Sequence, residues 1–286
     1  MDVSVSTWSL KGSAGITSGK ALIDAAKTCG LEALDLTLDD YYLNYWDWRK
    51  ATEEEIFAHF SELGAYAKQQ GVKIFQSHAP YGTFPKFYEE EFFTQTVKSI
   101  VATSAAGAKY CVIHSLIFPL YGKDLSENEM AFNMDFFARL LPYLKKYDVV
   151  ACLENLYDRY FDKEKGYIRE VFVSRPERLM QYLDRLDERY FGVCLDTGHL
   201  HMFGGDQREA IRTFGKRLKV LHIHDNDGVR DCHWLPKMGT IDWNGFVDTL
   251  KEVGYEGTLN LEIKPLPYIS ATLKAFEYVK ALTLSI

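Results

Sequence analysis

The stretch Leu221-His222-Ile223-His224-Asp225-Asn226-Asp227, followed closely by Asp231-Cys232-His233, decides how this chain is interpreted. Side chains two residues apart on a strand point the same way, so His222 and His224 share one face of an apolar strand. The polar loop that follows adds a second pair, Asp231 and His233. Imidazole and carboxylate together are the ligands that zinc or manganese prefers. Histidines held by hydrogen bonds, beside an acidic surface loop, would give the same pattern.

Five other apolar segments end in a residue that could bind a metal. A parallel barrel builds its active site from the carboxyl ends of several strands and the loops behind them. The sequence therefore predicts that these end residues converge on one point. The segments are 72–78, 110–114, 149–154, 191–196 and 258–262, and they end in His78, His114, Glu154, Asp196 and Glu262.

The spacing of these segments favours one domain. The chain has 286 residues and is 47% hydrophobic, which is enough for a large core. The strand-end residues 78, 114, 154, 196, 222 and 262 follow one another without a Pro-, Gly- or Ser-rich linker, and a strand-helix unit needs about 30 residues or more. We therefore expect a single domain over residues 1–286.

Strand and helix patterns alternate along the whole chain, which is typical of a parallel sheet. Eight units favour closure into a single (β/α)8 TIM barrel, and an open, doubly wound sheet is the alternative. We expect strands at 3–8, 33–38, 72–78, 110–114, 149–154, 191–196, 218–224 and 257–262, and helices at 19–28, 52–70, 90–106, 126–147, 175–186, 206–214, 242–253 and 269–284.

Composition and charge narrow the class of protein. No apolar run approaches the ~18 residues of a membrane span, and the first residues enter a strand pattern without the basic start of a signal peptide. The cysteine count is odd, and Cys111, Cys152 and Cys194 lie inside expected strands, where they pack as small hydrophobic residues. We therefore expect a cytoplasmic protein without a membrane partner. The net charge of -7 argues against a nucleic-acid partner.

Aromatic residues are frequent in the segments that follow the second and third expected strands. Such side chains can stack on a sugar face or shield a site from water. They can equally pack loops onto the barrel mouth or form a contact in a homo-oligomer, and both interpretations stay open. The residues are Tyr41, Tyr42, Tyr45, Trp46, Trp48, Tyr81, Phe84 and Phe87.

Glu154 and Glu262 are the strongest candidates for metal ligands. A carboxylate at the end of a buried strand must pair or bind a metal, because an unpaired buried charge is very costly. A salt bridge between Glu262 and Lys264 is the alternative. The run Asp196-Thr197-Gly198-His199 adds an acid with an imidazole three residues later, where a turn can return it to the same site.

These motifs, in this order and spacing, resemble the xylose-isomerase-like TIM barrels, a superfamily of sugar and sugar-phosphate isomerases and epimerases that also contains endonuclease IV. The resemblance extends from the third expected strand to the eighth. It is carried by His-Ala-Pro-Tyr (78–81), Leu-Glu-Asn (153–155), Leu-Asp-Thr-Gly-His (195–199), His-Ile-His-Asp-Asn-Asp-Gly (222–228), Asp-Cys-His (231–233), Gly-Thr-Ile-Asp-Trp (239–243) and Leu-Glu-Ile-Lys (261–264).

The resemblance implies a divalent ion, zinc or manganese with magnesium or cobalt as alternatives. Some members bind one ion and endonuclease IV binds three, so one to three per chain are expected. His199 is implied beside the substrate or a second metal, and His224 is expected to face the substrate or support a ligand. The shared metal ligands are Glu154, Asp196, His222 and Glu262, and the additional ones are His78, His114, Asp231 and His233.

The function so implied is a metal-dependent isomerase or epimerase of a small sugar or sugar phosphate. The ion polarises a carbonyl and stabilises an enediolate, while a carboxylate moves the neighbouring proton. Glu154 and Glu262 are the expected proton-transfer pair, and His199, His224 and Lys264 are expected to bind substrate. The alternative is an endonuclease IV-like multi-zinc phosphoesterase. The full ligand set favours that alternative, and the acidity and the isomerase-type loop 225–240 oppose it.

Overall fold

The structure is a computed structural model that describes residues 1–11, 16–81, 89–117, 126–158 and 169–265, with four isolated positions near the C-terminus. Phe84 and Phe87 lie outside the described residues, as does the expected helix 269–284 apart from those four positions, which are helical.

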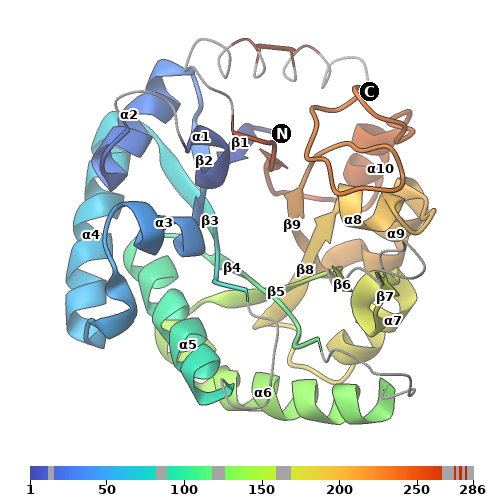
Figure 1. The fold of residues 1–286 in the computed structure, drawn as a ribbon, viewed down its shortest axis with the longest axis horizontal. Helices are drawn as coiled ribbons and strands as arrows, with labels where there is room; N and C mark the ends of the chain where they lie inside the picture. Colours follow the sequence, from blue (N-terminus) through green and yellow to red (C-terminus); the bar gives the residue numbers. More distant parts are fainter. Residues whose placement is uncertain are drawn as a thin grey trace.

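Eight parallel strands form a ring at the centre of the described chain (Figure 1). Their order is β10-β1-β2-β3-β4-β5-β8-β9, and a parallel bridge between Ile223 and Leu261 joins the last strand to the first. The predicted (β/α)8 barrel is therefore confirmed, and the open-sheet alternative is wrong. The strands are β1 (Val3–Ser6), β2 (Ala33–Thr37), β3 (Lys73–His78), β4 (Tyr110–Ile113), β5 (Val150–Glu154), β8 (Phe191–Asp196), β9 (Leu218–His222) and β10 (Leu259–Leu261).

The long helices surround this ring and cover the outer face of the strands. The helix α4 (Glu53–Gln70) shows how local sequence determines where a helix begins. The Thr52 hydroxyl accepts from the Glu55 N–H, and the Glu55 carboxylate accepts from the Thr52 N–H at 2.8 Å. Within the described residues no helix has the length and apolar character to cross a membrane. The larger helices are α2 (Gly19–Thr28), α4 (Glu53–Gln70), α5 (Glu89–Ala105), α6 (Ser126–Tyr147), α7 (Pro176–Leu183), α9 (Gln207–Phe214) and α10 (Phe246–Glu252).

Short elements at the strand ends were not predicted. The expected strand 3–8 ends at Ser6, whose hydroxyl accepts from the Trp8 N–H and starts a short helix. The expected helix 242–253 begins four residues later than predicted, because Gly245 at φ 70° turns the chain first. The additional elements are α1 (Thr7–Leu10), α3 (Leu38–Asn44), α8 (Thr197–His201), the turns η1 (Trp48–Lys50), η2 (Phe172–Ser174) and η3 (Gly215–Arg217), and the hairpin β6 (Tyr157–Asp158) and β7 (Arg169–Glu170).

A small apolar cluster fills the barrel interior beneath the strand ends. Most of its members lie two residues before a polar residue at the strand end, so both point inward. Cys152 precedes Glu154 and Cys194 precedes Asp196 in this way. All five cysteines are buried and none forms a disulfide, as was predicted for Cys111, Cys152 and Cys194. The cluster, called the floor below, contains Ala33, Phe75, Val112, Val150, Cys152, Cys194 and Val220.

Candidate metal centre

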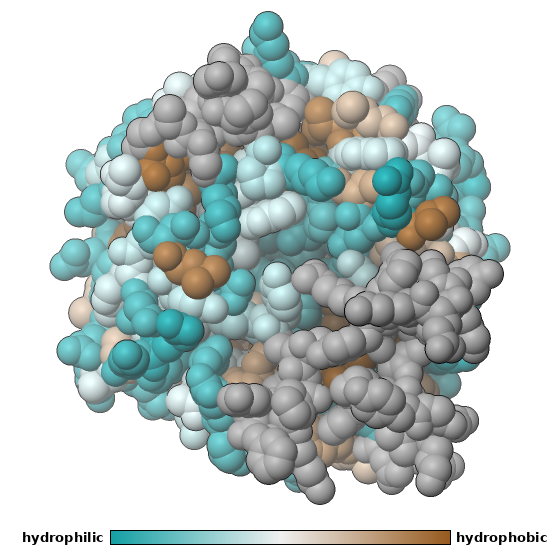
Figure 2. Space-filling model, in the orientation of Figure 1, coloured by the Kyte–Doolittle hydropathy of each residue, from teal (hydrophilic) through white to brown (hydrophobic). Residues whose placement is uncertain are grey.

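A cavity of about 670 Å³ opens above the floor, at the carboxyl ends of the strands. Figure 2 shows hydrophilic side chains gathered at the centre of this face. Seven of the nine predicted metal ligands reach the cavity wall: His78, His114, Glu154, His199, Asp231, His233 and Glu262. These residues come from β3, β5 and the segments that follow β4, β8, β9 and β10. They converge at the carboxyl ends of the strands, as the sequence predicted.

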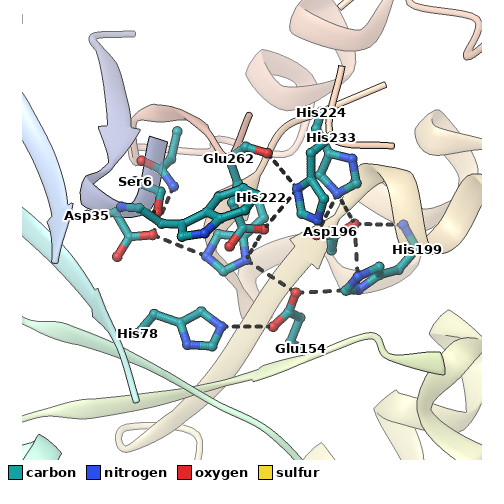
Figure 3. Close-up of polar contacts among 12 residues, drawn as sticks. Ser6, Asp35, His78, Glu154, Asp196, His199, His222, His224, His233 and Glu262 are labelled. Carbon is teal, nitrogen blue, oxygen red and sulfur yellow. Dashed lines mark hydrogen bonds and ion pairs between the residues drawn. The ribbon is translucent and has the colours of Figure 1, made fainter. Parts of the chain in front are cut away.

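Four side chains converge at the base of the cavity, and each offers one ligand atom within 4.8 Å of the others. They are the residues for which a shared metal was predicted: Glu154, Asp196, His222 and Glu262. His222 Nδ1 lies 3.2 Å from Glu154 Oε1 and 3.6 Å from Glu262 Oε2 (Figure 3). Three carboxylates share this small space with one imidazole, and buried acids so close together need compensating positive charge, which a bound cation would supply. The donor set therefore fits a divalent ion such as zinc or manganese.

Glu154 faces a different histidine pair with each of its two oxygens. Its Oε2 lies 2.7 Å from His114 Nε2 and 3.4 Å from His78 Nε2. Its Oε1 lies 3.2 Å from His222 Nδ1 and 3.5 Å from His199 Nδ1. A carboxylate placed in this way can contact two neighbouring cations, one through each oxygen.

Asp231 contacts two further predicted ligands, His199 and His233, on the other side of the cavity. His233 Nε2 lies 3.2 Å and His199 Nε2 lies 3.7 Å from Asp231 Oδ2, and the Tyr157 hydroxyl donates to the same oxygen at 2.9 Å. The backbone of His233 has φ 48°, a region that non-glycine residues seldom adopt, so the loop holds this imidazole in place at some conformational cost. All nine predicted ligands thus lie in one continuous cluster.

Three of the histidines hold one ring nitrogen against a backbone carbonyl. Nδ1 of His78 contacts the Ala79 carbonyl at 2.7 Å, and Nδ1 of His233 contacts the Glu262 carbonyl at 2.7 Å. His199 Nδ1 contacts the Asn155 carbonyl at 2.9 Å. A carbonyl only accepts, so Nδ1 donates in each case and Nε2 is the nitrogen left for a cation.

Without a cation, the cluster balances its charge by protonating histidines. Burial lowers the pKa of His199, but the charges of Asp196 and Asp231 outweigh it and raise the pKa to about 10. Burial also opposes protonation of His233, but the bond to Asp231 and the charge of Glu262 raise its pKa to about 9. For Asp231, the two imidazoles overcome burial and hold the pKa of the carboxyl well below its usual value.

The metal-free protein is therefore expected to lose stability as the pH rises from about 7 to about 10. An unfolded histidine titrates near pH 6.5, whereas His199 and His233 titrate at about 10 and about 9 in the folded chain. Their contribution is complete below the unfolded value and is lost as the pH passes through the folded values. The test is the melting temperature of chelator-treated protein against pH. A double variant, His199→Asn with His233→Asn, should flatten the slope, and an unchanged slope in that variant would refute the assignment.

The structure places the two other predicted substrate residues differently from each other. His224 is fully buried, its Nε2 lies 3.1 Å from the Asp196 carboxylate, and its ring stacks on His233 at 4.0 Å. It stands behind Asp196, away from the wall of the cavity. Lys264 is exposed and lines the cavity. The Glu262 carboxylate lies near His222 and His233, and does not form the salt bridge with Lys264 that was the alternative to metal binding.

The aromatic side chains near the barrel mouth have two different locations, the core and the cavity wall. Tyr41 and Trp48 are buried in the core, so they pack the segment after β2 onto the barrel. Tyr81 is exposed, lines the cavity and stacks on His114 with ring centroids 5.5 Å apart. Trp8, which was expected to end a strand, also lines the cavity and meets His233 edge to face at 5.0 Å.

Asp35 is the site residue that sequence reasoning missed. It is fully buried in β2, and its Oδ2 lies 3.3 Å from His222 Nε2. The signal was present, because an acid inside the apolar run 31–38 is the pattern that singled out Glu154. It was overlooked because Asp35 is followed by three more residues of apparent strand, whereas Glu154 ends its strand.

Fold and site together define a parallel (β/α)8 barrel with a carboxylate-histidine cluster, suited to a divalent metal, at the carboxyl ends of its strands. The chain belongs to the xylose isomerase-like TIM barrel family, whose model matches residues 23–281. This membership confirms the resemblance that the sequence motifs indicated.

Individual relatives differ in the activity that their names state. D-psicose 3-epimerase of Enterocloster bolteae is 22% identical over 254 residues, covering 85% of this chain and 76% of that protein. A probable endonuclease 4 of Mycoplasmoides gallisepticum is 30% identical over 168 residues, covering 52% and 49%. The crystal structure of IolI protein with a bound zinc atom superposes with a TM-score of 0.76 at 16% identity, covering 100% and 98%. Two further curated relatives are matched over only 39% and 63% of their own length.

Proposed function

We propose that this protein is a metal-dependent isomerase or epimerase of a small sugar, sugar phosphate or polyol-derived carbonyl compound. The observation that carries the proposal is the pair Glu154 and Glu262, whose carboxylates belong to the same group of four convergent ligands and both reach the cavity. The similarity to a D-psicose 3-epimerase and to a zinc-containing barrel supports this choice.

The proposed reaction assigns separate tasks to the residues of the site. Glu154, Asp196, His222 and Glu262 would hold the ion, which when bound supplies polarisation of the substrate carbonyl and stabilisation of the enediolate. One of the two glutamates removes the proton from the neighbouring carbon, and the other returns a proton. His224 orients the carboxylate of Asp196 through its Nε2.

The cavity wall provides the contacts for the rest of the substrate. The indole of Trp8 offers a flat apolar face beside His233, on which the C–H face of a sugar can lie. The exposed ammonium of Lys264 can donate to a hydroxyl or a phosphate oxygen. His199, at the cavity wall between Glu154 and Asp231, completes the proposed set by orienting a substrate oxygen.

Hydrogen exchange next to the carbonyl tests the proposal with a panel of compounds, so the substrate need not be identified first. Ketoses, keto derivatives of polyols and their phosphates would be incubated in deuterated water with manganese, cobalt, magnesium or zinc. NMR should show deuterium gain and new epimers for at least one compound, because a carboxylate base in an open cavity returns a solvent proton part of the time. Absence of exchange across the panel, with metal demonstrably bound, would reject the proposal.

A multi-zinc phosphoesterase is the second candidate. It is favoured by one observation, the assembly of all nine predicted ligands around a Glu154 whose two oxygens face two histidine pairs. In this alternative, His78 and His114 would hold a second ion, and His199, Asp231 and His233 a third. A cluster of this kind activates water and stabilises a leaving oxygen.

We expect no nicking of DNA at abasic sites above background. The net charge of -7 opposes the release of counterions that drives DNA association. A duplex with an abasic analogue, incubated with zinc or manganese, provides the measurement. Specific cleavage that disappears in His114→Ala would make the phosphoesterase the better assignment.

A further inference from the structure

Asp35 lies in the middle of β2 and points into the barrel, at the level of the proposed metal ligands. It is fully buried, and a buried carboxylate needs partners. The polar partners of its side chain contact the same carboxylate oxygen, Oδ2. Oδ2 accepts from Gln76 Nε2 at 3.2 Å and from Asn260 Nδ2 at 3.0 Å, and it lies 3.3 Å from His222 Nε2.

The position of this oxygen is fixed by neighbouring strands. The Ser4 hydroxyl donates to Asn260 Oδ1 at 2.9 Å, so the amide of Asn260 must present its Nδ2 to Asp35. Gln76, on β3, holds the carboxylate from the other side. Both amides are neutral, so they place the carboxylate without cancelling its charge.

His222 stands between two acidic surroundings, one at each ring nitrogen. Figure 3 shows Asp35 on one side of the ring and Glu154 on the other. Nδ1 faces the carboxylates of Glu154 and Glu262 at 3.2 and 3.6 Å. A neutral imidazole has one donor and one acceptor nitrogen, so the partner of Nε2 decides whether Nδ1 has a free lone pair.

We propose that Asp35 is a positioning residue that keeps the proton of His222 on Nε2 and so leaves Nδ1 free to bind the metal. This inference rests on the metal site of the proposed function. A carboxylate accepts only, so it retains the Nε2 proton. Without it, Glu154 and Glu262 hold the proton on Nδ1, and a metal must displace that proton before it binds. A carboxylate behind a ligating histidine also makes the imidazole a stronger ligand.

The test compares Asp35→Asn and Asp35→Ala with wild type in metal affinity, measured for zinc and for manganese by competition with a chelator. We expect Asp35→Ala to bind about 10- to 100-fold more weakly. In Asp35→Asn, the amide oxygen still accepts from Gln76 and Asn260 but carries no charge. The metal affinity of this variant should therefore lie between those of wild type and Asp35→Ala. The control is Ser77→Ala on β3, a buried residue whose hydroxyl bonds to Thr103 at 2.6 Å. It should bind metal as wild type does.

A second readout reports the tautomer directly. Nitrogen-15 spectra of the zinc-loaded wild type should show His222 protonated at Nε2 and ligated at Nδ1, and this signature should weaken in the variants. A merely structural role of Asp35 would lower the melting temperature of the metal-free protein and leave affinity and spectrum unchanged, which would overturn the inference. If Asp35→Ala does not fold, Asp35→Asn decides by the same criterion. A wild type that binds no metal would instead reject the proposed function.

Discussion

Glu154→Gln and Glu262→Gln are each expected to lower the rate of hydrogen exchange beside the substrate carbonyl by about 10²- to 10⁴-fold, the usual contribution of a positioned acid or base. A carboxamide has nearly the same shape as a carboxylate but cannot take up the proton. We expect the larger loss of exchange rate in Glu154→Gln, because Glu154 Oε2 also contacts His114 at 2.7 Å. Exchange would be followed by NMR in deuterated water with the best substrate of the panel.

Metal content must be measured in the same samples, because both glutamates are also proposed ligands. Glu170→Gln is the matched control, since Glu170 lies on β7 and pairs with Arg175 at 2.8 Å. That variant should exchange at the wild-type rate. If both site variants keep wild-type exchange while retaining metal, the assignment of Glu154 and Glu262 as proton-transfer residues is wrong.

Loss of the ion is expected to have the second-largest effect. Protein purified without chelator should contain at least one divalent ion per chain, and His222→Ala and Asp196→Ala should contain less than wild type in elemental analysis. A ligand that binds only the folded state at 100 times its Kd adds about 2.7 kcal/mol to the free energy of unfolding. Added zinc or manganese should therefore raise the melting temperature of chelator-treated wild type.

The two variants should respond less than wild type to added metal, because each lacks one of the four convergent ligands. His59→Ala provides the control for loss of an imidazole elsewhere. His59 lies on α4, outside the cavity, and its ring contacts Tyr41 and Trp46. Wild-type metal content and an undiminished thermal response in both His222→Ala and Asp196→Ala would contradict the proposed ligand set.

Repeating patterns made the larger elements predictable from the sequence. The bounds of α2, α6 and β8 agree with the prediction, because a strong amphipathic or apolar pattern ends there at a clear signal. The helices α1 and α3 were missed, since each continues an apolar strand without a break in pattern. Their turns depend on the packing at the barrel mouth, which no local pattern reveals.

The candidate site also has a part that could be predicted from the sequence and a part that could not. Strand ends of a parallel barrel meet at one rim, so the convergence of Glu154, Asp196 and His222 could be predicted from the sequence. The contact between Asp35 and His222 could not, because it depends on register between strands far apart in sequence. The burial of His224 behind Asp196 depends on Gly198, which leaves room for the ring where a Cβ would collide with it.

The floor of the barrel closes one end of the site. Val112, Cys152, Cys194 and Val220 are completely buried, so their side chains seal the base of the cavity from the lower end of the barrel. The proposed metal and substrate would therefore enter and leave through the mouth of the barrel, as solvent does. A substrate bound in the cavity would stand between the proposed ion and bulk water, so we expect the metal to exchange more slowly when substrate is bound than when the cavity is empty.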